Sequence, residues 1–148
     1  MEQNDDNFET HRPPLRVAMV GLGRAALLDH LPALRSLPEL YQVTAVCDLI
    51  RERRTIVEKA YPKVRMYRRV EDMMDDPDID LVDIALPTTD HQSAALESLS
   101  RGRYTLLETP LALSHDAATI LKAASVKAQG RLFAYTPDAL EPLPYHPG

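Results

Sequence analysis

A glycine turn between an apolar segment and an amphipathic one constrains this chain more than any other feature. Residues 15–20 read Leu-Arg-Val-Ala-Met-Val, an apolar and β-branched run that predicts a buried strand. Gly21, Gly23 and Ala26 follow it at the spacing G-x-G-x-x-A, and residues 24–37 carry leucines at helical intervals. A strand, a tight glycine turn and a helix in this order are typical of a dinucleotide-binding unit.

Each position of the turn has a physical role in that interpretation. Gly21 permits the tight turn, Gly23 lets a pyrophosphate approach the backbone, and Ala26 lets the helix pack close to the strand. The helix then offers free amide donors and the positive end of its dipole to the phosphates. The alternative is a plain turn between strand and helix that holds no ligand. Pro32 is expected to kink the helix or to restart it.

An acidic residue ends the second predicted strand, residues 42–47. Asp48 lies 25 residues after Gly23, near the spacing of the acid that binds the adenosine ribose hydroxyls, so NAD is the expected cofactor. Three arginines follow in the next predicted helix: Arg51, Arg53 and Arg54. They form either a solvated helix face or a site for the 2′-phosphate, so NADP remains possible.

The alternation of strands and helices continues to residue 135. Further strands are expected at 64–67, 81–86, 104–107 and 132–135, and helices at 51–61, 70–74, 91–101 and 114–129. Asp90 and Ser114 are the expected N-caps, and Gly102 and Gly130 the expected helix ends. Near-continuous apolar strands predict an α/β fold with a doubly wound parallel sheet, six strands in the order 3-2-1-4-5-6.

The chain of 148 residues is long enough for one domain with its own core. We expect a mobile acidic tail at 1–14, a dinucleotide-binding domain at 15–136 and a Pro-rich irregular segment at 137–148. Four acids among the first ten residues carry most of the net charge of −5. The remaining body is nearly neutral, which argues against nucleic acid or an anionic membrane as a partner.

The reactive side chains outside the turn point to no metal chemistry. The five histidines are scattered without ligand spacing, so no metal is expected. Cys47 is the single cysteine, and its apolar strand predicts a buried, reduced thiol. The N-terminus lacks a signal peptide pattern, and the apolar runs are too short for a spanning helix. A cytoplasmic location is expected.

Several blocks of this sequence resemble, in order and spacing, the N-terminal domain of the Gfo/Idh/MocA family of oxidoreductases. The resemblance spans residues 15–136 and rests on the segments 20–26, 30–34, 46–48, 76–80, 84–87 with His91, and 107–113. Members of that family are NAD(P)-dependent oxidoreductases of sugars, polyols and related hydroxyl or carbonyl compounds. The resemblance implies cofactor contacts at Gly21, Gly23, Arg24, Ala26, Asp48, Pro87, His91 and Glu108.

The resemblance leaves two matters open. His91 either touches the nicotinamide half of the cofactor or is a polar residue at a helix start. Thr109 stands where the family usually has a lysine, and threonine supplies neither its charge nor an amine of tunable pKa.

No counterpart of the family's second, substrate-binding domain follows, so no catalytic residue is assigned. The partner of such a domain would be a dinucleotide together with a separate substrate domain or a second copy. The alternative function is a non-catalytic, degenerate or split-off module with a regulatory or partner-binding role.

Overall fold

A parallel sheet organises the structure, a computed structural model that describes residues 12–136. Its six strands lie in the order β3-β2-β1-β4-β5-β6, which confirms the predicted doubly wound topology. The strands are β1 (Leu15–Val20), β2 (Tyr41–Cys47), β3 (Arg65–Tyr67), β4 (Leu81–Ile84), β5 (Tyr104–Glu108) and β6 (Leu132–Tyr135). The predictions for residues 1–11 and 137–148 lie outside the described residues.

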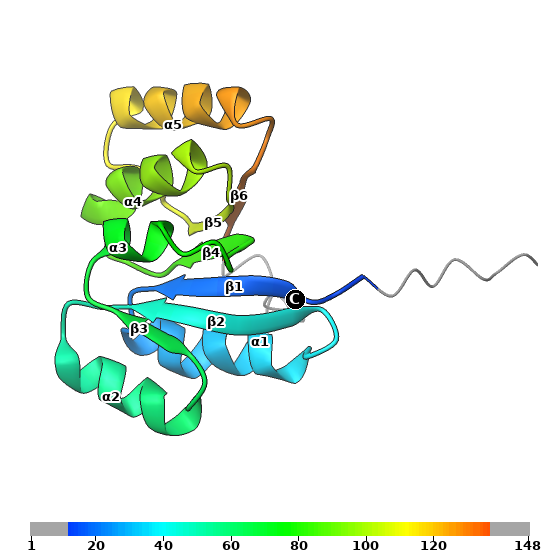
Figure 1. Ribbon diagram of the computed structural model, residues 1–148. Coiled ribbons are helices and arrows are strands. Elements are labelled where there is room, and N and C mark those ends of the chain that lie inside the picture. The colour runs from blue at the N-terminus through cyan, green and yellow to red at the C-terminus, as the bar shows by residue number, and fades with distance from the viewer. Residues whose placement is uncertain (1–11, 137–148) are drawn as a thin grey trace, which may run out of the picture.

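Helices cover the two halves of the sheet from opposite sides. Figure 1 shows α1 and α2 on one side and α3, α4 and α5 on the other. The helices are η1 (Ala26–His30), α1 (Leu31–Ser36), α2 (Arg51–Ala60), α3 (Val70–Met74), α4 (Thr88–Ser100) and α5 (His115–Lys127). The strand order runs outward from β1 in both directions, and because every neighbouring pair is parallel, the carboxyl ends of all six strands share one edge.

Two apolar clusters hold the helices to the sheet. Met19 and Val46 pack with Ala26, Leu31 and Val57 on the side of α1 and α2. The other cluster joins β1, β4 and β5 to α3, α4 and α5: Ala18, Val20, Met73, Met74, Val82, Ile84, Ala94, Ala95, Leu107 and Leu121 are all members. Strand β1 contributes residues to both clusters and is therefore buried on both faces, as its near-continuous apolar sequence predicts.

The predicted proline kink takes the form of a π-helical turn. The five residues Ala26–His30 form η1, and the N–H of Leu31 donates to the carbonyl of Ala26, five residues earlier. Pro32 has no N–H to donate to the carbonyl four residues earlier, so the α-helical ladder is interrupted there, and the helix contains one extra residue in the turn before α1.

The start of α4 differs from the prediction. We expected Asp90 to cap a helix from His91, whereas the helix begins at Thr88 with Pro87 in the capping position. Proline is well tolerated there because its missing N–H belongs to the helix start, where no intrahelical acceptor exists. Asp90 instead lies in the first turn, where its charge faces the positive end of the helix dipole. The predicted cap Ser114 is confirmed, since its hydroxyl accepts from the N–H of Ala117.

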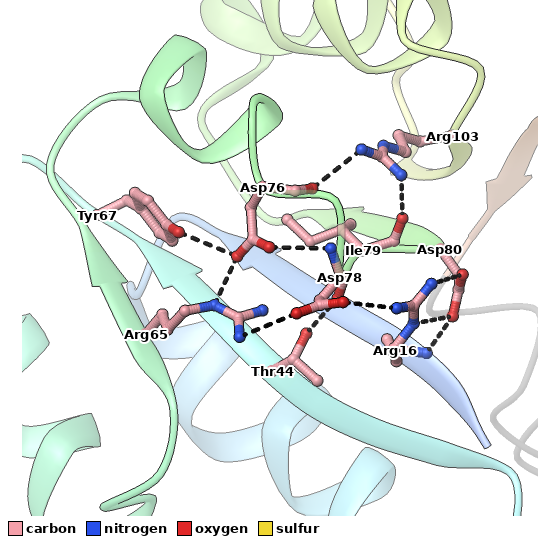
Figure 2. Close-up of polar contacts among 9 residues, drawn as sticks. All are labelled: Arg16, Thr44, Arg65, Tyr67, Asp76, Asp78, Ile79, Asp80 and Arg103. Atoms are coloured by element: carbon pink, nitrogen blue, oxygen red, sulfur yellow. Dashed lines mark hydrogen bonds and ion pairs between the residues drawn. The ribbon is translucent and has the colours of Figure 1, made fainter. Parts of the chain in front are cut away.

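Ion pairs tie the amino-terminal edge of the sheet together, at the end opposite the glycine turn (Figure 2). Asp76, whose side chain is 4% exposed, accepts from Arg65 at 2.6 Å, from the Tyr67 hydroxyl at 2.9 Å and from the N–H of Asp78. Asp80 receives a bidentate pair from Arg16 on β1. The segment that leads into β4 is thereby fixed to β3 and β1.

No helix among residues 12–136 is long and apolar enough to cross a membrane.

We expect Asp76→Asn to lower the free energy of unfolding by about 2 kcal/mol, because Arg65 and Tyr67 lose a charged acceptor in a buried position. Urea titration measures this change. The control is Asp116→Asn, the same substitution at a fully exposed position on α5, and it should leave the unfolding midpoint unchanged.

The same carboxylates predict acid sensitivity. Burial raises the pKa of Asp76, but hydrogen bonds from Asp78, Tyr67 and Arg65 outweigh it, and the net pKa is lowered. The hydrogen bond from Arg16 is the largest cause of the lowered pKa of Asp80. A carboxyl whose pKa is lower in the folded state stabilises the protein above its unfolded pKa. That stability should be lost as pH falls below about 4, and less of it should be lost in Asp76→Asn.

Candidate functional site

A cavity of about 950 Å³ lies along the carboxyl ends of the strands, between the two halves of the sheet. This edge is where parallel α/β sheets bind ligands, at the point where the strand order reverses. Six of the eight residues expected to contact a cofactor line it: Gly21, Gly23, Arg24, Asp48, Pro87 and Glu108. The structure brings these residues together from β1, β2, β4 and β5, although they are spread over 88 positions of the sequence.

Gly21 cannot be replaced without displacing the backbone of β4. Its φ is +86°, and a Cβ placed on it would lie 2.6 Å from the carbonyl oxygen of Ala85. Only glycine combines this φ with so close an approach. The turn after β1 therefore presses directly against the end of β4.

Gly23 has a different environment, open toward the cavity. A Cβ at this position would meet only the tip of the Arg53 side chain, at 4.0 Å. Bare backbone thus faces the cavity at the start of the helix, as the predicted approach of a pyrophosphate requires. Ala26 is fully buried between the helix and β1, which is the close packing that the sequence predicted for it.

Asp48 links the glycine turn to the turn after β2. One carboxylate oxygen accepts from the N–H of Leu22 at 2.8 Å and the other from the N–H of Ile50 at 2.7 Å. The side chain is 7% exposed, and Arg53 lies 3.5 Å from it. A carboxylate has about four lone-pair sites, so Asp48 retains acceptors for hydroxyl groups of a ligand.

Arginines surround this end of the cavity. Arg53 from α2 and Arg68 and Arg69 from the turn after β3 line it together with Asp48. Sequence reasoning missed Arg68 and Arg69, although they directly follow β3, which pairs with β2 in the predicted order. Their guanidinium groups give the cavity donors suited to phosphate.

The opposite end of the cavity is acidic. Pro87, Asp90 and Glu108 line it, contributed by the carboxyl ends of β4 and β5 and the start of α4. His91 does not line the cavity. It is 2% exposed, and its ring nitrogens lie 3.1 Å from the carbonyl oxygen of Pro110 and 2.8 Å from that of Leu86. In this structure the ring joins the loops after β4 and β5 from behind the cavity wall.

The remaining reactive side chains add no further chemistry to the site. Burial raises the pKa of the Cys47 thiol to about 12, so it stays protonated and unreactive at neutral pH. Within residues 12–136, no group of three or more histidine, cysteine, aspartate or glutamate side chains could hold a metal ion.

A family model described as "Oxidoreductase family, NAD-binding Rossmann fold" matches residues 15–136. Inositol 2-dehydrogenase from Salmonella typhimurium is 29% identical over 101 residues, which cover 68% of this chain and 30% of that protein. An uncharacterized oxidoreductase from Schizosaccharomyces pombe is 30% identical over 109 residues, covering 71% of this chain and 29% of its own. The chain spans about a third of the length of these relatives.

Solved structures agree with these matches. The WlbA dehydrogenase from Bordetella pertussis, in complex with NADH and UDP-GlcNAcA, is 25% identical with a TM-score of 0.78, covering 83% of this chain and 36% of that one. KijD10, a 3-ketoreductase from Actinomadura kijaniata in complex with NADP and TDP-benzene, is 25% identical with a TM-score of 0.74, covering 84% and 37%.

The two glycines of the turn predict opposite outcomes for the same substitution. Gly21→Ala should lower the free energy of unfolding by about 2 kcal/mol or more, because the new Cβ meets a backbone carbonyl in a left-handed conformation. Gly23→Ala should leave it within about 0.5 kcal/mol of the original, because the position is open. Thermal unfolding of the two variants side by side measures the difference, and equal losses would contradict the geometry of the turn.

Proposed function

Because the chain belongs to the Gfo/Idh/MocA family of oxidoreductases, with their NAD-binding Rossmann fold, we propose that its cavity binds a nicotinamide dinucleotide. The observation that carries the proposal is the bare backbone at Gly23, which opens onto the cavity where the helix begins. A pyrophosphate fits there because it needs amide donors and close approach, and no side chain other than the flexible end of Arg53 lies near.

The two ends of the cavity give the bound molecule a direction. Asp48 and the arginines after β2 and β3 offer acceptors and donors for the adenosine ribose and its phosphates. Pro87 and Glu108 lie at the other end, so the nicotinamide ring belongs over β4 and β5. Arg24 lies between them, beside the pyrophosphate position. His91 would act on this half of the site only by holding the two loops in place.

Both forms of the cofactor find matching groups in the cavity. Asp48 suits the two ribose hydroxyls of NAD, and Arg53 lies 3.5 Å from it, within reach of a 2′-phosphate. We propose NAD as the preferred cofactor, because the buried carboxylate would repel a phosphate, with NADP as a possible second ligand. The similar structures include one solved with NADH and one with NADP.

The chemistry we propose is oxidoreduction of a hydroxyl or carbonyl compound, as the sugar and inositol names of the relatives suggest. A bound dinucleotide would be the hydride carrier, and this chain would position its nicotinamide ring. Thr109 hydrogen-bonds to Thr136 at 3.0 Å, and its hydroxyl carries no charge with which to move a proton at neutral pH. A non-catalytic module remains the second candidate, but no contact among residues 12–136 favours it.

We propose that a substrate domain packs against the sheet of this domain. The face of β4, β5 and β6 that α4 leaves uncovered has an apolar groove of about 360 Å³, where Tyr104 and Phe133 are 42% and 50% exposed. Apolar side chains gathered this way mark a surface that packs against protein. A separate substrate domain is the proposed occupant, and a dimer in light scattering would point to a second copy instead. A cytoplasmic location, as predicted from the single reduced cysteine, is part of the proposal.

Titration calorimetry with NADH and NADPH tests the proposal, and absence of binding at millimolar concentration would overturn it. Asp48→Ala should weaken the binding of both cofactors, because it loosens the glycine turn. The binding of NADH should weaken about tenfold more than that of NADPH, because only NADH loses the acceptor of its ribose hydroxyls.

The ratio of the two dissociation constants is the informative quantity, since the loosened turn affects both cofactors alike. Asp90→Ala removes a carboxylate from the opposite end of the cavity and should leave that ratio unchanged. An equal loss for NADH and NADPH in Asp48→Ala would exclude the ribose role of Asp48.

A further inference from the structure

A chain of three hydrogen-bonded side chains lies beside the nicotinamide end of the cavity. His30 Nδ1 is 2.9 Å from the Oδ2 atom of Asp83, and His30 Nε2 bonds to the hydroxyl of Tyr135. The side chains of His30 and Asp83 are 9% and 4% exposed. Residues from η1, β4 and β6, far apart in the sequence, thus meet at one point.

Strand pairing places these three side chains on the same face of the sheet as Glu108. Tyr135 pairs with Glu108 across β5 and β6, and Asp83 pairs with Leu106, two residues earlier on β5. Side chains two apart on a strand share a face, so Asp83, Glu108 and Tyr135 all lie toward η1. Since Glu108 lines the cavity, the chain of three borders the position proposed for the nicotinamide ring.

The surroundings of His30 favour its protonated form. No donor within residues 12–136 reaches the buried Oδ1 atom of Asp83, so the charge of that carboxylate is balanced mainly by His30. Burial lowers the pKa of His30, but the hydrogen bond to Asp83 and the charges of Asp83, Glu108 and Asp29 outweigh it, and the net pKa is raised. Burial and the same acids raise the pKa of Tyr135, which stays a neutral phenol.

We propose that His30, held between Asp83 and Tyr135, is a proton-binding group whose charge follows the oxidation state of the bound dinucleotide. The inference rests on the proposed function. The oxidised ring carries a positive charge and disfavours a neighbouring imidazolium, so its binding releases the proton of His30. The reduced ring is neutral and leaves His30 protonated.

The two protonation states present opposite groups to a substrate at Tyr135. With His30 neutral, Nδ1–H donates to Asp83 and Nε2 accepts from Tyr135, whose oxygen is then free to accept the proton of a substrate hydroxyl. A bound oxidised dinucleotide would accept the hydride of that alcohol, and the hydroxyl proton would pass through Tyr135 to Nε2 of His30. With His30 charged, the reverse path returns the proton to a carbonyl oxygen.

NAD⁺ and NADH are a matched pair for the test, because they differ only in the nicotinamide ring. We expect the affinity for NAD⁺ to rise about tenfold from about pH 6 to about pH 8.5, while that for NADH stays within about twofold. Calorimetry in two buffers of different ionisation enthalpy should show proton release on binding NAD⁺. In His30→Gln both affinities should be independent of pH, whereas the control His115→Gln, on exposed α5, should behave as the original protein.

A second pair of measurements separates proton binding from a merely structural contact. Asp83→Asn removes the charge but keeps the shape, and should move the midpoint of the NAD⁺ profile to lower pH by about one unit. NAD⁺ should shift the Tyr135 Cζ signal in NMR spectra of the original protein and not of His30→Gln. Parallel pH profiles for NAD⁺ and NADH, or a profile unchanged in His30→Gln, would overturn the inference alone. Failure of either dinucleotide to bind at any pH would overturn the proposed function and this inference with it.

Discussion

The contact on which the rest of the molecule depends is the one between Gly21 and Ala85. At this point the turn after β1 meets the end of β4, and a Cβ would lie 2.6 Å from a carbonyl oxygen. The strand order reverses here, so the two halves of the sheet, and the helices on its opposite sides, are set relative to one another by the same contact. The cavity lies at this junction because the loops after β1 and β4 lead to helices on opposite sides of the sheet.

Most of the fold could be predicted because its signals are local. Apolar runs of four to six residues predicted β1, β4 and β6, and the glycine turn with Asp48 predicted which edge holds the site. The boundary of α4 was wrong because Pro87 takes the capping position and the helix starts at Thr88, three residues before the predicted start. Arg68 and Arg69 could have been inferred from the predicted order, which places β3 beside β2. The hydrogen bond between His30 and Asp83 could not be predicted, because it depends on how the two side chains turn in the folded protein.

The two edges of the sheet hold different kinds of charge. At the amino-terminal edge, Asp76 and Asp80 accept hydrogen bonds from arginines and backbone donors. These ion pairs hold the segment before β4 to the neighbouring strands. At the carboxyl edge, Asp48 keeps unused acceptor sites and Asp83 has an oxygen that no donor reaches within residues 12–136. In the described part of the chain, the buried atom that lacks a partner near the cavity is thus a carboxylate acceptor, whereas at the opposite edge it is a donor, the Nε atom of Arg103.

The carboxylate of Asp48 accepts hydrogen bonds from two backbone N–H groups, and these bonds give the glycine turn its shape before any ligand arrives. A loop that must order itself around a phosphate loses conformational entropy in doing so, and affinity falls accordingly. Here that ordering is part of folding. The turn is therefore a preformed binding site, and its association rate should be set by diffusion and orientation more than by loop closure.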